Sequence, residues 1–355
     1  MREESGSGKR PTVKDVAARA GVSAPTVSRV LSGNYPVAAS TRARVLRAMR
    51  DLDYVVNAQA RGLSGTTTKT VAFVVDDVTG PFFAHIARGV EQQAASEGRL
   101  CLLLTTHGDP MRELAVVDLM REQRAEAVIL VGGALNEEHF TERMIGFARA
   151  LDKSGSRLVL CGRPSLGEGV PAQVVSYDNQ GGAYAMTAHL LSAGHRRIAY
   201  LGRAIGLSTT DERIEGFRAA HADHGVELDE SLIVPGEFSR ESGHELTKRL
   251  LAERGDVTAV FASTDMVAIG VYKALREAGL RIPEDMSVVG FDDIPFAADL
   301  APGLTTVRVP HEQLGREAVR LGLQGSAPSQ IVLGTHIVVR GSVSRPRSRD
   351  ARSGR

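Results

Sequence analysis

Short apolar runs alternate with helix-length segments along the chain from Thr70 onward. Such runs are typical of buried strands, and strands separated by helical segments are typical of βαβ units around a parallel sheet. The alternation restarts at Gln173, so we predict two doubly wound α/β lobes in tandem. The predicted strands are residues 71–75, 100–104, 127–131 and 157–160 in the first lobe, and 173–177, 197–201, 259–262 and 287–291 in the second.

The length of 355 residues predicts two or three folded units. The longest apolar runs fall far short of the ~20 residues that a membrane-spanning helix needs. Residues 1–11 are polar and do not resemble a signal peptide, so we expect a disordered N-terminus and a cytoplasmic protein. Cys101 and Cys161 lie in apolar runs, which indicates buried hydrophobic residues. His189 and His195 lack metal-site spacing, and we expect neither a metal site nor a cofactor.

Charge is distributed unevenly along the chain. Residues 1–65 contain 11 basic and 5 acidic side chains, whereas the whole chain has a net charge of +1. A basic head on a mildly acidic body indicates a polyanionic partner for the head alone. Runs of charged residues are usually only solvated surface. The pattern of residues in the head must therefore decide between a polyanion-binding surface and an ordinary solvated one.

The head contains signals for three short helices. Thr12 begins a capping pattern, and the apolar spacing that follows predicts a helix that ends at Gly21. Ser23 can cap a second helix, with Pro25 tolerated in its first turn. A third helix is expected to start near Ser40. Two short helices joined by a tight glycine turn, with a third completing the core, predict a helix-turn-helix unit. The expected buried positions are Val13, Val16, Ala17 and Ala20 in the first helix, Val27, Val30 and Leu31 in the second, and Val45, Leu46, Met49 and Leu52 in the third.

The run TVKDVAARAGVSAPTVSRVLSG, residues 12–33, resembles the DNA-binding headpiece of the lactose-repressor (LacI) family of bacterial transcription regulators. The resemblance implies that the second helix enters the major groove of a palindromic operator. Arg29 could then donate a bidentate pair of hydrogen bonds to guanine, or it could contact only phosphate. The DNA-binding residues that the resemblance implies are Thr12, Ser23, Ala24, Pro25, Thr26, Ser28, Arg29, Asn57, Arg61 and Leu63.

Residues 57–64 resemble the hinge helix of that family, in which a leucine wedges into the minor groove. Leu63 occupies the matching position, while Val56 stands where many relatives have proline. An eight-residue helix that contains Gly62 should not be stable alone, so we expect it to fold on DNA. The alternative is that residues 62–69 are a flexible linker.

The resemblance continues to residue 342 through VSYDNQGGA, LLSAGHRRIAYLG, ERIEGF, SVVGFDDI and PGLTTV. It implies a two-lobed effector domain similar to type I periplasmic sugar-binding proteins. A guanidinium and a carboxylate can together hold vicinal hydroxyls, and an aromatic face can stack on a sugar ring. The implied effector is therefore a small polar molecule such as a sugar, held by Phe82, Phe83, Arg213, Thr264, Asp265 and Asp292.

Alternatives remain for these residues and for the chain. Phe82 and Phe83 could be core residues, and Arg213 and Asp292 could form a structural pair. Thr264 replaces the asparagine of many sugar-responsive relatives, so the effector cannot be carried over from one of them. A solute-binding protein without a DNA role and an effector-independent transcription factor are the alternative functions. The motifs of nucleotide-binding, phosphate-binding and serine-hydrolase sites are missing, which argues against an enzyme.

The resemblance also implies a homodimer, because one headpiece contacts only one half-site of double-stranded operator DNA. No membrane partner is expected, and we place the protein with the nucleoid. The basic segment 344–355 should be disordered and lacks the heptads of a coiled coil. The expected organisation is a headpiece at 12–56, a hinge and linker at 57–69, and an effector and dimerisation domain at 70–343.

Overall fold

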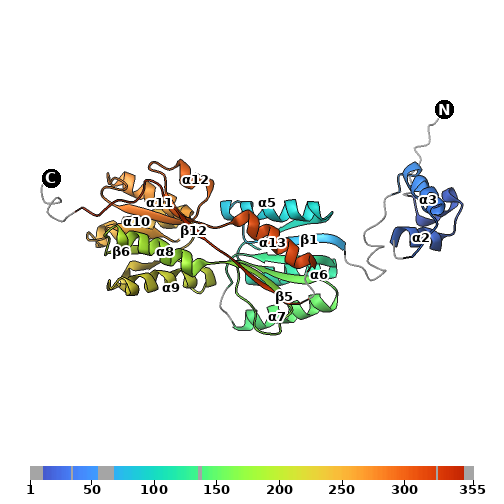
Figure 1. Cartoon of the computed structure of the whole chain (residues 1–355), viewed down its shortest axis with the longest axis horizontal. Helices are drawn as coiled ribbons and strands as arrows, with labels where there is room; N and C mark the ends of the chain where they lie inside the picture. The colour runs from blue at the N-terminus through green and yellow to red at the C-terminus, as the bar shows by residue number, and fades with distance from the viewer. Residues whose placement is uncertain (1–10, 33–34, 55–67, 135–137, 325–326, 348–355) are drawn as a thin grey trace, which may run out of the picture. The chain divides into compact units, whose positions relative to one another are not determined.

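The computed structural model describes residues 11–32, 35–54, 68–134, 138–324 and 327–347. The chain divides into two compact units, Met1–Thr68 and Lys69–Arg355, and each is described by itself. The described part of the first unit, which we call the headpiece, consists of helices, whereas the second unit contains two α/β lobes (Figure 1).

The headpiece contains α1 (Val13–Ala20), α2 (Ala24–Ser32) and α3 (Ala39–Asp51), as the sequence predicted. The Asp15 carboxylate accepts hydrogen bonds from the Thr12 N–H and hydroxyl, both at 2.7 Å, and so caps α1. Gly21 ends α1 with φ of 63°, a conformation that glycine adopts without strain. Leu46 was expected to be buried, but it is 41% exposed because Val45, Ala48 and Met49 form the inner face of α3.

The first lobe is a six-stranded sheet in the order β11-β5-β4-β3-β1-β2. The pairs β1–β2, β3–β4, β4–β5 and β5–β11 are parallel. Helices cover the faces of this sheet (Figure 1). Its strands are β1 (Thr68–Val75), β2 (Leu100–Thr105), β3 (Ala125–Val131), β4 (Arg157–Cys161), β5 (Ala172–Tyr177) and β11 (Gln330–Leu333). Its helices are α5 (Pro81–Ser96), α6 (Pro110–Glu122), α7 (Glu138–Lys153) and α13 (His311–Gln324).

The second lobe is a six-stranded sheet in the order β12-β10-β9-β8-β6-β7, in which β12 runs antiparallel to β10. Its strands are β6 (Ile198–Arg203), β7 (Ile233–Pro235), β8 (Ala259–Ala262), β9 (Ser287–Asp292), β10 (Thr305–Arg308) and β12 (His336–Val338). Its helices are α8 (Asn179–Ser192), α9 (Ser208–Asp223), η1 (Glu230–Leu232), α10 (Arg240–Glu253), α11 (Asp265–Glu277) and α12 (Pro295–Asp299).

The prediction that segment 173–177 starts the second lobe is wrong. This segment is β5, which pairs with β4 and β11 in the first sheet. The chain passes between the lobes after Tyr177, again after Arg308 and once more after Leu333. The periodicity of apolar residues marks a strand but does not determine which sheet it joins, so the lobes exchange strands instead of following each other in tandem. Strands β7, β10, β11 and β12 were not predicted from the sequence.

Strand β2 was expected to be buried, but among the described strands it lies at an edge of the first sheet, where it pairs with β1. Leu100, Leu102 and Leu103 are 62%, 37% and 52% exposed. Cys101 on the same strand is half-buried, whereas Cys161 on β4 is fully buried, as predicted. Burial raises the pKa of the Cys161 thiol to about 12, so the thiol stays protonated.

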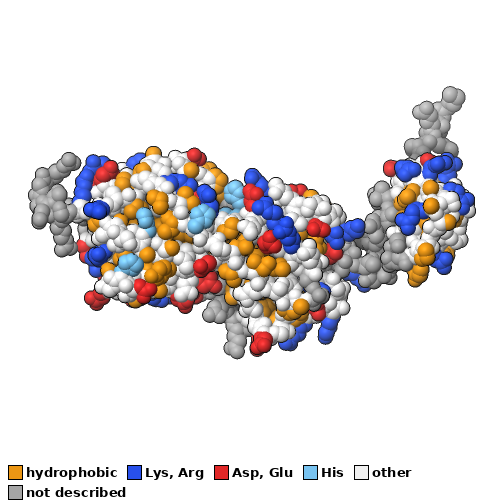
Figure 2. Space-filling model, viewed as in Figure 1, with side chains coloured by type: hydrophobic (Ala, Val, Ile, Leu, Met, Phe, Trp, Pro, Cys, Tyr) orange, Lys and Arg blue, Asp and Glu red, His pale blue; other side chains and the backbone are white. Residues whose placement is uncertain are grey.

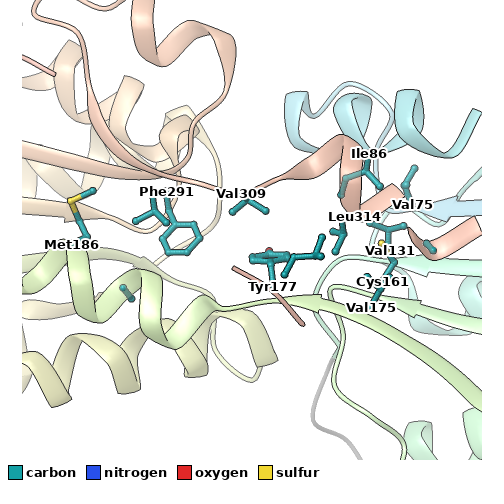
Figure 3. Packing of buried hydrophobic residues seen from close by; sticks show 14 of the residues in the cluster. Val75, Ile86, Val131, Cys161, Val175, Tyr177, Met186, Phe291, Val309 and Leu314 are labelled. Atoms are coloured by element: carbon teal, nitrogen blue, oxygen red, sulfur yellow. The ribbon is translucent and has the colours of Figure 1, made fainter. Parts of the chain in front are cut away.

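A hydrophobic core runs from one lobe into the other. Figure 3 shows Tyr177 and Val309 between Phe291 of the second lobe and Leu314 of the first. Helices α5 and α13 lie side by side (Figure 1) and approach each other through glycine. A Cβ atom at Gly89 would lie 2.1 Å from the backbone oxygen of Glu312, so only glycine permits this separation.

The start of the C-terminal segment is ordered, contrary to our expectation for residues 344–355. The His195 ring nitrogen Nε2 lies 2.9 Å from the backbone oxygen of Ser344, and Arg347 forms an ion pair with Asp285 at 2.8 Å. The Ser344 N–H also donates to the hydroxyl of Ser287. The prediction of disorder rested on the amino-acid composition of this segment, which carries no information about such specific contacts with the second lobe. Residues 348–355 lie outside the described part.

Candidate functional site

Helix α2 presents two faces with different chemistry. Val27 and Val30 are buried against α1 and α3, whereas Pro25, Ser28 and Arg29 are exposed. This separation follows the helical period, because residues three and four apart share a face. The exposed face therefore presents a guanidinium and a hydroxyl on a short, rigid helix, which are groups that can contact DNA.

The other predicted DNA-binding residues of the described headpiece lie at helix starts. The Thr26 N–H donates to the Ser23 hydroxyl oxygen at 3.3 Å, and the two hydroxyl oxygens are 2.8 Å apart. Ser23 therefore caps α2, as predicted, while Ala24 is its first residue. Thr12 is exposed at the start of α1. Asn57, Arg61 and Leu63 lie outside the described residues.

Basic side chains dominate the headpiece surface. Figure 2 shows many Lys and Arg side chains and few acidic ones on the visible face of this unit. The described headpiece has seven basic residues and three acidic ones. A positive potential of this kind attracts a phosphate backbone without regard to sequence.

The second unit contains a cavity of about 160 Å³ between its two lobes. Phe82 and Phe83, at the start of α5, line it from the first lobe, and they also pack against the core. Arg213 of α9, Thr264 before α11 and Asp292 at the end of β9 line it from the second lobe. The cavity thus lies at the carboxyl ends of strands, where α/β proteins commonly bind ligands.

Arg213 is held rigidly in this cavity, with only 2% of its surface exposed. Its Nε donates to Asn179 at 2.9 Å, and its two amino groups donate to the backbone oxygen of Ser263 at 2.6 Å and to the Tyr177 hydroxyl at 3.3 Å. Its guanidinium carbon also lies 3.8 Å from the centre of the Phe291 ring. These contacts fix the guanidinium plane, so the side chain would need little further ordering to hold a ligand.

The carboxylate of Asp292 has fewer hydrogen-bond partners than the guanidinium of Arg213. Its Oδ1 lies 3.5 Å from an amino group of Arg213 and has no hydrogen-bond partner among the described residues. Burial raises the pKa of Asp292 to about 7, although the charge of Arg213 opposes this. Its backbone φ is 113°, which is strained for a residue other than glycine. A buried carboxylate oxygen with spare hydrogen-bonding capacity can accept a ligand hydroxyl.

Asp265 was predicted to bind the effector, but the structure does not bring it into the lining of the cavity. It is fully buried, and its two oxygens accept hydrogen bonds from the Thr306 hydroxyl at 2.5 Å and the Ile294 N–H at 2.9 Å. These bonds tie the start of α11 to β10 and to the loop after β9. The resemblance implied that Thr264 and Asp265 both hold the effector, but adjacent residues at a helix start point in different directions.

Thr264 lines the cavity and also caps a helix. Its hydroxyl oxygen accepts a hydrogen bond from the Val267 N–H at 3.3 Å and so caps α11. The hydroxyl hydrogen remains able to donate to a ligand, since a threonine hydroxyl both donates and accepts.

Several residues that line the cavity were not predicted from the sequence. Asp76 directly follows β1 and Tyr177 ends β5, so the rule that ligands bind at the carboxyl ends of strands could have identified both. Leu207, Thr209 and Phe238 belong to loops and a helix start that only the tertiary structure brings to the cavity. Within the described ranges, there is no cluster of three or more potential metal ligands and no helix suited to span a membrane.

Comparisons with known proteins agree with this architecture. Residues 12–57 match the family model for bacterial regulatory proteins of the lacI family, and residues 187–343 match the model for a periplasmic binding protein-like domain. The chain is 37% identical over 347 residues to the HTH-type transcriptional regulator CelR of Thermobifida fusca, which covers 94% of this chain and 98% of CelR.

Two solved structures of regulators are also similar. A complex of the transcriptional regulator CelR with cellobiose has a TM-score of 0.68 and 34% identity, and it covers 94% of this chain and all of that one. A lac repressor dimer bound to operator has a TM-score of 0.79 at 24% identity over 95% of this chain and all of that one, which supports the fold alone. Because the headpiece, the effector-domain fold and a relative of matching length all agree, the chain belongs to the LacI family and is a DNA-binding transcription regulator.

Proposed function

We propose that this regulator is a repressor that binds a palindromic operator as a homodimer and is controlled by a small, uncharged, polyhydroxylated effector in the interlobe cavity. The observation that carries the effector proposal is the fixed Arg213 beside the under-bonded Asp292. A guanidinium that donates and a carboxylate that accepts can together hold two neighbouring hydroxyls.

The walls of the cavity support a sugar-like ligand. Phe82 and Phe83 pack edge to face, with ring centres 5.2 Å apart, and supply apolar surface for the C–H face of a ring. The charged lining residues are Asp76, Arg213 and Asp292, so carboxylates outnumber cations. CelR is similar to this chain and was solved with cellobiose, which is a neutral sugar.

The homodimer is supported by the exposed leucines of β2. Leu100 and Leu103 present apolar surface on an unpaired sheet edge, which soluble monomers rarely leave uncovered. Packing of this edge against a second copy would remove the apolar side chains from water. It would also bring together the two headpieces that a palindromic operator requires. We expect Leu103→Glu to convert dimers to monomers in sedimentation experiments, whereas the control Leu119→Glu, at an exposed leucine of α6, should remain dimeric.

Regulation would act through the angle between the lobes. The chain passes between the lobes three times, and Asp292 accepts a long backbone hydrogen bond from Val309 at the second passage. A ligand that contacts both lobes can favour one angle, and its differential affinity for the two states sets the change in DNA affinity. A coupling of ~1 to 3 kcal/mol corresponds to about a 5- to 150-fold change.

The test begins with the selection of operator DNA from a random library by the full chain. Neutral sugars are then screened for a shift in melting temperature and for a change in operator affinity by fluorescence anisotropy. We expect a neutral sugar to change both, and Asp292→Asn to lose this response while the exposed control Glu241→Gln keeps it. The proposal for the effector is refuted if only anionic or apolar compounds change both quantities.

A further inference from the structure

We propose that the second unit contains a separate binding site for a small oxyanion, either free phosphate or the phosphate group of a small molecule. The site is a groove of about 510 Å³ where the chain passes between the lobes, and we call it the crossover groove. Its walls are the loop after β9, the segment after β10 and the start of α13. This inference goes beyond the proposed function and does not depend on a sugar-like effector.

The crossover groove is distinct from the interlobe cavity. Asp292 lines the cavity, whereas the next residue, Asp293, lines the groove. Ile294 is buried and lines both spaces. His311 lines the groove and packs edge to face on Phe82, which lines the cavity, with ring centres 4.9 Å apart. The two spaces therefore have a wall of apolar and aromatic side chains in common but are lined by different charged residues.

Guanidinium groups from three segments converge on the crossover groove. Arg308 ends β10, Arg316 lies on α13 and Arg340 follows β12. Among the described lining residues these three cations face two carboxylates, those of Asp293 and Glu312. An arginine matches the geometry of a phosphate group and can bind it through two parallel hydrogen bonds. The excess of guanidinium groups therefore favours an oxyanion, in contrast to the interlobe cavity, where carboxylates outnumber cations.

Asp293 fixes two of these arginines. Its side chain is 4% exposed, and its two oxygens accept hydrogen bonds from Nε of Arg308 at 2.5 Å and from an amino group of Arg340 at 2.7 Å. The other amino group of Arg340 donates to the backbone oxygen of Leu304. The hydrogen bonds of Arg308 to described residues use Nε only, so both of its amino groups can donate to a ligand. The ion pairs thus hold the guanidinium groups in place without using all of their donors.

The start of α13 also favours an anion. The helix has 14 residues, and the first N–H groups of a helix find no acceptor within it, which gives this end a partial positive charge. Glu312, in the first turn, accepts hydrogen bonds from Arg88 at 3.1 Å and from Arg316 at 3.4 Å. Two cations therefore compensate its charge, so Glu312 opposes a bound anion less than an isolated carboxylate would.

His311 gives an independent indication of a ligand. It is 7% exposed, and its Nε2 has no hydrogen-bond partner among the described residues. Burial lowers the pKa of His311 to about 3, so its ring is neutral and carries one N–H donor. His85 also lines the groove, and its ring stacks on that of His311. An unsatisfied polar atom in a buried ring is costly, and an oxyanion beside it would supply an acceptor.

Access and size are suited to a small ligand. Arg308 is exposed and Arg316 is half-buried, so solvent reaches the groove. Figure 2 shows histidine and basic side chains close to one another on the visible face of this unit. The volume exceeds the ~300 Å³ at the lower end of typical ligand sites. The groove can therefore hold an oxyanion attached to a small molecule as well as free phosphate.

Calorimetric titration of the full chain at constant ionic strength tests the proposal. The probes are inorganic phosphate, glycerol 3-phosphate and, as an uncharged control, glycerol. We expect both phosphates to bind more tightly than glycerol. Tighter binding of glycerol 3-phosphate would identify a phosphate ester as the ligand, whereas equal or tighter binding of inorganic phosphate would identify the free anion. If neither phosphate binds more tightly than glycerol, the site does not exist, while the proposed sugar-like effector is unaffected.

Two matched pairs of variants on α13 locate the anion, which is necessary because the basic headpiece also attracts phosphate. Arg316→Gln removes a guanidinium that lines the groove, and Glu312→Gln removes a carboxylate that lines it. Arg320→Gln and Glu317→Gln make the same changes at an ion pair that does not line it. We expect Arg316→Gln to weaken phosphate binding about ten-fold, Glu312→Gln to strengthen it several-fold, and both controls to bind like the wild type.

The opposite signs of these two effects separate electrostatic binding from damage to the fold, because damage to the fold can only weaken binding. Unchanged phosphate affinity in both Arg316→Gln and Glu312→Gln would place the anion elsewhere and overturn the assignment of the groove. Weaker binding in Glu312→Gln, or an equal loss in Arg316→Gln and Arg320→Gln, would also overturn it. Each of these outcomes would leave the proposed function unchanged, since none of the four residues lines the interlobe cavity.

Discussion

Replacement of Asp292 by asparagine should stabilise the effector-free protein increasingly as the pH rises from 5 to 7. Asp292 is 5% exposed, and burial raises the pKa of its carboxyl group to about 7 from an ordinary value of 3.8. Between these two values the folded protein keeps the proton and the unfolded chain releases it. The wild-type protein therefore loses stability as the pH rises toward 7, and asparagine, which cannot ionise, does not.

The size of the effect follows from linkage. Each unit of pKa difference corresponds to about 1.4 kcal/mol, and the slope flattens as the pH approaches the pKa of the folded state. We compare the free energy of unfolding of Asp292→Asn with that of the wild type. The difference between the two proteins should be about 2 kcal/mol larger at pH 7 than at pH 5. Well above pH 7 Asp292 is ionised in both the folded and the unfolded protein, and the difference becomes constant.

Urea unfolding of the full chain at pH 5, 6 and 7 measures this difference directly. Comparison of the two proteins at each pH cancels the titration of all other groups, and the exposed Glu241→Gln serves as a control that should show no trend. A difference that stays constant from pH 5 to 7 would refute the reasoning. It would mean that the charge of Arg213, 3.5 Å away, outweighs burial and keeps Asp292 ionised throughout.

The same carboxyl group should make effector binding depend on pH. An ionised Asp292 can accept hydrogen bonds from ligand hydroxyls at both of its oxygens. The protonated form carries a hydrogen on one oxygen and accepts less well, so effector affinity should rise from pH 6 to pH 8, as the carboxyl group loses its proton around its pKa of about 7. Calorimetry with the best-binding sugar measures this change. Retention of the full pH dependence in Asp292→Asn would assign it to another group.

Further predictions concern the headpiece and the packing of the second unit. Arg29→Ala should cost ~1 to 3 kcal/mol on operator and little on random DNA in anisotropy titrations, and an equal loss on both would make Arg29 a phosphate contact. Gly89→Ala should lower stability by ~1 to 3 kcal/mol or more because α5 and α13 must separate, whereas Gly146→Ala on α7, with open space around it, should not; equal urea midpoints for the two variants would contradict this. Thr306→Val should cost ~1 to 3 kcal/mol because it leaves Oδ1 of buried Asp265 without its hydroxyl donor, and an unchanged urea midpoint would show that the bond contributes nothing.

Local sequence was sufficient for the headpiece and for most strands. Its three helices follow from capping residues and from the spacing of Val16, Val27 and Val45, which act over a few residues each. The position of Leu46 shows the limit of this reasoning, because adjacent apolar residues on a helix cannot all face the core.

The cavity was predictable only in part. Motif resemblance pointed to Arg213, Thr264 and Asp292, which the structure brings together at one cavity. It also pointed to Asp265, whose carboxylate is instead used within the fold. A motif identifies neighbours in sequence, whereas the direction of each side chain depends on where its helix begins.

The sequence by itself determined the local elements, the βα alternation and the basic head, because these depend on contacts between residues close in the chain. Only the tertiary structure decided that β5 and β11 complete the first sheet, that β2 exposes its leucines at an edge, and that Leu207 and Phe238 line the cavity. The physical reason is that strand pairing and burial depend on residues more than a hundred positions apart, as with the pairing of β11 to β5. Apolar periodicity carries no information about such distant partners.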